Sequence, residues 1–205
     1  MTYTLAVVTA GLSDPSSTRL LADRLTTAVS ERLRSGGHDV LVEVVELRPL
    51  AHALADKLLT GFPTGDLESA VAAVSQADAL IAVTPIFTAS YSGLFKTFFD
   101  VLDKDSLTGT PVLLGATAGT SRHSLVIEHA MRPLFAYLRA IPAPTGVFAA
   151  AEDWAGADGV DAALARRIDR AADELADLVT GRPAQRRPAD PFADVPSFEE
   201  LLRGQ

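Results

Sequence analysis

A glycine followed by several hydroxyl side chains is the first segment whose residue types suggest chemistry. It reads Gly11-Leu12-Ser13-Asp14-Pro15-Ser16-Ser17-Thr18-Arg19 and stands between an apolar run and a helical pattern. Backbone amides at a helix N-terminus favour an anion, and four hydroxyls add hydrogen-bond donors: Ser13, Ser16, Ser17 and Thr18. The segment is neither a Walker loop nor a G-x-G-x-x-G fingerprint. It predicts a phosphate site, and it is also consistent with an ordinary helix cap.

A second segment combines a proline, an aromatic residue and hydroxyls. It reads Thr84-Pro85-Ile86-Phe87-Thr88-Ala89-Ser90-Tyr91-Ser92-Gly93 and follows another apolar run. We expect the proline to bend the chain outward, so that main-chain groups lie beside an aromatic side chain at Pro85, Ile86, Phe87 and Thr88. A flat heteroaromatic ring suits that mixture. The alternative is a hydrophobic loop packed under the next helix.

A third segment is rich in small residues. It reads Gly115-Ala116-Thr117-Ala118-Gly119-Thr120-Ser121. Small residues let the backbone approach a ligand closely, and hydroxyls donate to it, at Thr117, Ala118, Gly119 and Thr120. Taken alone, the segment is equally consistent with a plain turn.

Five apolar, β-branched runs precede or follow these segments and must position them. They are Tyr3–Ala10, Val40–Leu47, Ala79–Thr84, Pro111–Ala116 and Thr145–Ala150. Dense apolar runs are typical of strands buried on both faces of a parallel sheet. Helical spacing separates them at 20–33, 67–74, 94–102, 127–138 and 161–179, while 48–65 reads as an irregular connection with a helical turn at 53–59. The alternation predicts an α/β flavodoxin-like fold, a five-stranded parallel sheet with helices on both faces. Ligands of such sheets lie at the carboxyl ends of the strands, which puts the three segments on one edge.

Composition excludes several classes of protein. The chain has 205 residues, a net charge of −8 and no cysteine, which disfavours nucleic acid or anionic membranes as partners and excludes thiolate metal sites. No apolar stretch approaches the ~20 residues of a membrane span. No pair of the four histidines has metal-ligand spacing. We expect a cytoplasmic protein with one domain at 1–181 and a Pro- and Arg-rich tail at 182–205, whose Phe198, Leu201 and Leu202 would dock on the body.

The second segment also resembles a known family. Together with Lys96 and Asp100 it is similar to the NADPH-dependent FMN reductase family, whose members in two-component monooxygenase systems typically show T-P-x-Y-x-x-S-Y-x-G-x-x-K-x-x-x-D. The run Glu128-His129-Ala130-Met131-Arg132-Pro133-Leu134 resembles that group's fourth helix. The resemblance covers about residues 3 to 150 and is strongest to the actinobacterial FMN reductases paired with a luciferase-like monooxygenase.

The resemblance implies that the three segments hold FMN. Its phosphate would lie at residues 13–18 and its isoalloxazine ring between 85–88 and 117–120. Phe87 stands where a tyrosine is common and Thr88 where a lysine is frequent, which bears on how tightly flavin is held. His129 is implied to have a structural role at a subunit interface near the flavin.

The implied activity is reduction of FMN by NAD(P)H, with reduced flavin supplied to a partner monooxygenase. Hydride passes between the two cofactors, so we nominate no catalytic side chain. Two alternatives remain open on the same fold: a quinone or azo reductase that keeps its flavin, and a flavodoxin-like electron carrier. The resemblance further implies a homo-dimer or tetramer.

Overall fold

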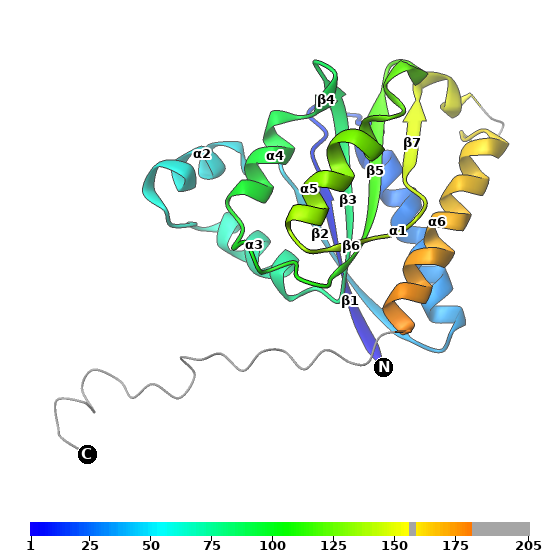
Figure 1. Cartoon of the computed structure of the whole chain (residues 1–205), viewed down its shortest axis with the longest axis horizontal. Helices are drawn as coiled ribbons and strands as arrows, with labels where there is room; N and C mark the ends of the chain where they lie inside the picture. Colours follow the sequence, from blue (N-terminus) through cyan, green and yellow to red (C-terminus); the bar gives the residue numbers. More distant parts are fainter. Residues whose placement is uncertain (156–158, 182–205) are drawn as a thin grey trace.

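One parallel sheet organises the protein. The computed structural model describes residues 1–155 and 159–181, and the predicted tail at 182–205 lies outside them. The strands are β1 (Thr2–Thr9), β2 (Asp39–Glu46), β3 (Ala79–Phe87), β4 (Ser90–Tyr91), β5 (Pro111–Ala118), β6 (Ile141–Pro142) and β7 (Val147–Ala150). Their order is β2-β1-β3-β5, with β6 and β7 both pairing with β5, so that these two short strands share the fifth position (Figure 1). The predicted flavodoxin-like α/β fold is confirmed.

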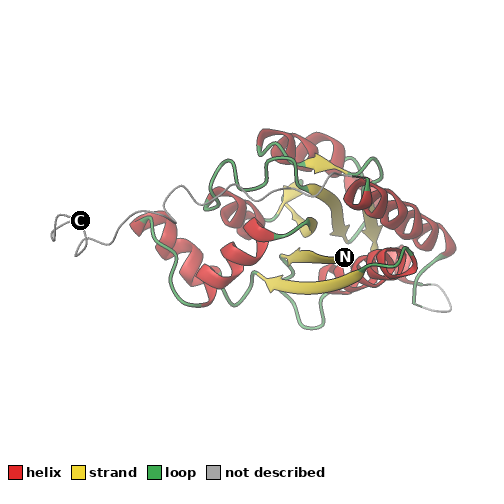
Figure 2. Cartoon of the chain, turned by 90° about the horizontal axis from the view of Figure 1, so that it is seen from below, coloured by secondary structure: helices red, strands yellow, loops and turns green. Residues whose placement is uncertain are grey.

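Helices cover both faces of the sheet, as Figure 2 shows. The α-helices are α1 (Ser17–Ser35), α2 (Ala51–Thr60), α3 (Asp66–Gln76), α4 (Gly93–Asp100), α5 (Arg132–Tyr137) and α6 (Ala162–Thr180). Short helices of other types are η1 (Ser121–His123), η2 (Ile127–Met131) and η3 (Ala151–Trp154). One core cluster joins the sheet to α1 and α6, and the other joins it to α2, α3, α4 and α5. Three phenylalanines of α4, at positions 95, 98 and 99, are buried in the second cluster. Burial of both faces explains the dense apolar strands.

An ion-pair cluster fastens α1 to α6. Arg32 donates to Asp173 at 2.5 Å and to Asp169 at 3.1 Å. The hydrogen bond and the charge of Asp173 raise the pKa of Arg32 above its usual value. The guanidinium therefore stays ionised wherever the protein is folded.

The strand before the second segment is longer than predicted. We expected Pro85 to bend the chain outward after Thr84, but β3 continues through the proline to Phe87. Pro85 forms the last parallel pair with β5, opposite Thr117, and beyond it Ile86 pairs antiparallel with Tyr91 of β4. The strand therefore extends beyond the proline, and after Pro85 it leaves the ladder with β5 for the hairpin with β4. A proline is tolerated at the end of a ladder, where few further N–H donors are needed.

Two helical segments also differ from expectation. The connection at 48–65 holds the ten-residue helix α2, whose Leu54 is buried and which ends at left-handed Gly61. The segment at 127–138 begins as a π-helix, in which the N–H of Arg132 donates to the carbonyl of Ile127. Pro133 has no N–H and cannot donate the α-helical hydrogen bond to the carbonyl of the residue four positions earlier. The absence of this bond favours the wider turn of a π-helix.

Candidate functional site at the carboxyl edge of the sheet

The three segments meet at the carboxyl edge of the sheet, the upper edge in Figure 1. Pro85 lies opposite Thr117 in the β3–β5 ladder, which brings the second and third segments side by side. The hydroxyls of Thr18 and Thr117 lie 2.8 Å apart and are buried, which fastens the first segment to the third. The fold thus assembles the three segments into one site.

The first segment turns tightly into α1. Ser16 is the N-cap, and its hydroxyl accepts from the backbone N–H of Arg19 at 3.2 Å. A methyl group on Gly11 would lie 2.0 Å from the Ser16 Oγ, so the loop folds closely against its own glycine. This arrangement leaves the backbone amides at the start of α1 directed away from the helix, where an anion binds.

A hollow of about 290 Å³ lies in front of this loop. Its lining residues come from β1, the first segment, α1 and the end of β2: Thr9, Gly11, Ser13, Asp14, Ser16, Arg19, Glu46 and Arg48. The Thr9 side chain is only 3% exposed, and its hydroxyl has no hydrogen-bond partner among the residues that the structure describes. A buried hydroxyl without a partner costs free energy, and this one lies in the wall of the hollow with almost no surface of its own exposed.

Two arginines and two carboxylates line the hollow: Arg19, Arg48, Asp14 and Glu46. Arg19 pairs with Asp23 at 2.7 Å and with Glu46 at short range. Arg48 has no ion pair among residues 1–155 and 159–181. A cation, the loop hydroxyls of Ser13 and Ser16 and a close-approach glycine together fit a phosphate group.

The second segment is a hairpin with a left-handed turn. Thr88 has φ 50° and Ala89 has φ 69°, which makes the two-residue loop of type I′. Left-handed backbone costs a residue with a Cβ about 1–2 kcal/mol. The turn holds the side chain of Phe87 48% exposed beside the half-buried Ile86. The hairpin therefore presents an apolar and main-chain surface to the site.

The third segment follows β5, and its residues become more exposed along the chain; we call residues 117–120 the ledge. Thr117 is buried, Ala118 is half-buried, and Gly119 and Thr120 are exposed. The hydroxyls of Thr117 and Thr18 are hydrogen-bonded to each other, so this pair holds the first and third segments together.

The sequence-predicted residues take different places at this edge. Ser13 and Ser16 line the hollow, Ser17 is exposed at the first position of α1, and Thr18 is buried. Sequence reasoning missed Thr9, Arg19, Glu46 and Arg48 as lining residues. Thr9 could have been found as a polar side chain at the end of a buried strand. Glu46 and Arg48 could have been found as charged side chains at or just after the end of the second strand.

His129 of η2 and His123 of η1 are both exposed. Within the described part of the chain, no group of acidic or histidine side chains is arranged to hold a metal ion. No helix among the described residues is long and apolar enough to cross a membrane.

A doubly wound parallel sheet with a polar hollow at its switch-point edge, beside a hairpin and a loop of small residues, has the architecture of flavodoxin-like proteins, whose ligands bind at this edge. Comparison with known proteins gives the family. Residues 3–155 match the model of the family described as NADPH-dependent FMN reductase. The chain is 36% identical over 185 residues to the NADH-dependent FMN reductase SfnE of Pseudomonas putida, covering 90% of this chain and 97% of that protein.

Solved structures agree. An oxidoreductase from Corynebacterium diphtheriae is 48% identical with a TM-score of 0.84, covering 89% of this chain and 99% of that one. The apo form of the NADH:FMN oxidoreductase EmoB is 26% identical with a TM-score of 0.78, covering 92% and 96%. The chain belongs to the NADPH-dependent FMN reductase family. It is an oxidoreductase whose cofactors are FMN and NAD(P)H.

Proposed function

We propose that this protein reduces FMN with NAD(P)H, releases the reduced flavin, and so supplies a partner monooxygenase. The observation that supports the FMN site is the hollow at the start of α1, lined by Ser13, Ser16 and the close-approach Gly11. Ser13, Ser16 and Ser17 with the neighbouring amides would hold the phosphate. Thr18 would contribute by keeping the loop in place through Thr117.

The ring would lie between the hairpin and the ledge. Residues 85–88 offer apolar side chains and main-chain groups on one side, and residues 117–120 offer small residues on the other. None of the twelve proposed contact residues has a titratable side chain. When bound, FMN supplies the two-electron chemistry as the acceptor of a hydride from NAD(P)H, while this chain binds and orients.

Exchange of the flavin is supported by the exposure of the site. Phe87, Thr88, Gly119 and Thr120 are all exposed in the single chain, so one subunit alone would cover the ring on few sides. A flavin held this loosely suits a reductase that treats FMN as a substrate, and suits a tightly loaded quinone reductase less well.

The test is anaerobic reduction followed by ultrafiltration. Protein is mixed with FMN and excess NADH or NADPH, and the filtrate is assayed for reduced FMN. We expect reduced FMN in the filtrate and turnover with free FMN as the only acceptor. Retention of all flavin by the protein, with turnover only after a quinone is added, would refute the proposed release.

We also propose that the protein is a homo-oligomer. Large apolar side chains are exposed just before η2 and at the end of α5, where Leu125 is exposed and Tyr137 is 79% exposed. Isolated exposure is common, but two such residues flank exposed His129, the residue whose implied role is at a subunit interface. Light scattering that gives a monomer mass at micromolar protein would refute this proposal.

A further inference from the structure

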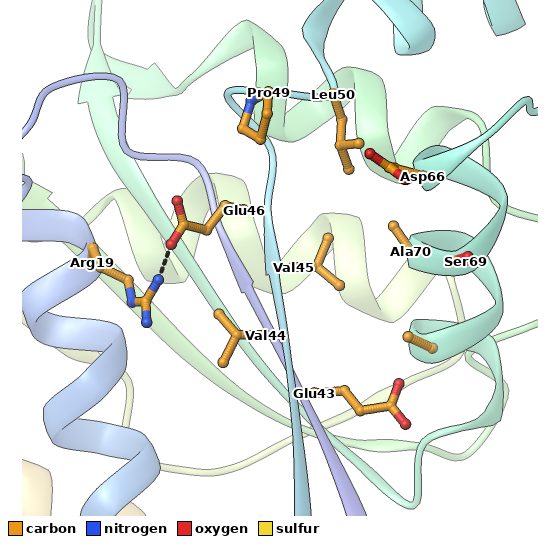
Figure 3. Close-up of a pocket in the computed structure, with 11 residues that line it drawn as sticks. Arg19, Glu43, Val44, Val45, Glu46, Pro49, Leu50, Asp66, Ser69 and Ala70 are labelled. Atoms are coloured by element: carbon orange, nitrogen blue, oxygen red, sulfur yellow. Dashed lines mark hydrogen bonds and ion pairs between the residues drawn. The ribbon is translucent and has the colours of Figure 1, made fainter.

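A groove lies along the free edge of the sheet, on the far side of the hollow from the ring ledge. It measures about 650 Å³, within the range of small-ligand sites. Among the described strands β2 pairs only with β1, and it forms the floor of the groove. The helix α3 forms one wall, and Arg19 of α1 reaches the other side (Figure 3).

The groove and the hollow share a boundary. Arg19 and Glu46 line both, and the ion pair between them, drawn as a dashed line in Figure 3, is the partition. A ligand whose phosphate occupied the hollow could extend over this pair into the groove. FMN ends at its phosphate, whereas FAD continues through a second phosphate to adenosine.

The lining of the groove suits a neutral ring with hydroxyl groups. Val45 from β2 and Ala70 from α3 point toward one another across it, with Leu50 above them in Figure 3. Three carboxylates also line it, from Glu43, Glu46 and Asp66. Apolar side chains accommodate a purine face, and a carboxylate at the end of a second strand accepts hydrogen bonds from ribose hydroxyls in doubly wound folds.

Charge separates the two compartments. Three carboxylates and one arginine line the groove, which disfavours a phosphate there, whereas two carboxylates and two arginines line the hollow. One of these arginines, Arg48, is a cation without an ion pair in the described part of the chain. From these observations we infer that the groove between β2 and α3 is a subsite for the adenosine half of FAD, with the second phosphate held near Arg48. This inference rests on the proposed FMN site.

The experiment compares FAD and FMN binding after the groove is filled. Ser69→Trp places an indole in the groove from an exposed position on α3, and Glu68→Trp is the matched control, one residue earlier, exposed and outside the lining. Flavin fluorescence titrations give both dissociation constants. We expect Ser69→Trp to weaken FAD by about tenfold or more relative to the control and to leave FMN unchanged.

A second measurement uses the unmodified protein. Millimolar adenosine should raise the apparent dissociation constant of FAD without altering that of FMN. This competition tests the adenosine subsite even if Ser69→Trp does not fold. Unchanged FAD binding in both measurements would overturn the inference. If Ser69→Trp raised only the KM of NADH, the inference would also be overturned, because the groove would then bind the nicotinamide dinucleotide. Failure of the unmodified protein to bind FMN would instead refute the proposed FMN site.

Discussion

Gly11→Ala is the sharpest perturbation of the phosphate loop. The added methyl would lie 2.0 Å from the Ser16 Oγ, 3.0 Å from its Cβ and 3.3 Å from the Thr18 Cβ, so the Ser16 hydroxyl must rotate out of its capping position and the loop must shift slightly. Loss of the Ser16 cap costs about 1 kcal/mol of stability. Displacement of the loop also removes charge-assisted hydrogen bonds to phosphate, each worth about 1.5–3 kcal/mol. We therefore expect FMN binding to weaken by at least about tenfold.

The assay is a pair of fluorescence titrations, with FMN and with riboflavin, alongside a thermal melt. Gly93→Ala is the control, because a methyl at that position, the first of α4, would meet nothing within 4 Å. Riboflavin has no phosphate, so its weaker binding should change less than that of FMN. Wild-type FMN affinity and an unshifted melt in Gly11→Ala would refute the geometry of the loop.

Four further predictions test other parts of the structure. Thr18→Val and Thr117→Val should each destabilise the fold by about 1–3 kcal/mol, because each leaves one buried hydroxyl unpartnered, and the double variant should lose less than the sum; strict additivity in urea melts would contradict the pairing. Ala89→Gly should stabilise by about 1 kcal/mol, since φ 69° suits glycine; a lower urea midpoint would contradict the strained turn. His129→Ala should leave the rate of FMN reduction within a few-fold in rapid mixing, and a loss of ~10³-fold with flavin bound would indicate acid–base chemistry. Deleting residues 190–205 should lower the melting temperature or the oligomer mass while FMN still binds; no change in either would show that the tail does not dock.

The backbone of the site was predictable because strand burial and edge position follow from residue type. The dense apolar runs of β1, β3 and β5 require a sheet buried on both faces, and a parallel sheet puts the ends of its strands on one edge. That is why three separate segments could be assigned to one site before any contact was known.

The details that escaped prediction depend on contacts between distant residues. Glu46 and Arg48 reach the hollow only because β2 lies beside β1, a neighbour relation that no local pattern encodes. The continuation of β3 through Pro85 depends on the hairpin formed with β4. The π-helix at Ile127 has the same apolar spacing as an α-helix and differs only in its main-chain hydrogen bonds.

The central claim is that FMN binds through its phosphate at the start of α1 and is reduced there by NAD(P)H. The most direct test is steady-state NAD(P)H oxidation with FMN and with riboflavin, in the unmodified protein and in a variant with Ser16 and Ser17 replaced by alanine. Charge-assisted contacts worth about 2–4 kcal/mol predict a kcat/KM for FMN at least about 30-fold above that for riboflavin. The variant should erase most of that difference. Equal kcat/KM values for the two flavins in the unmodified protein would contradict the claim.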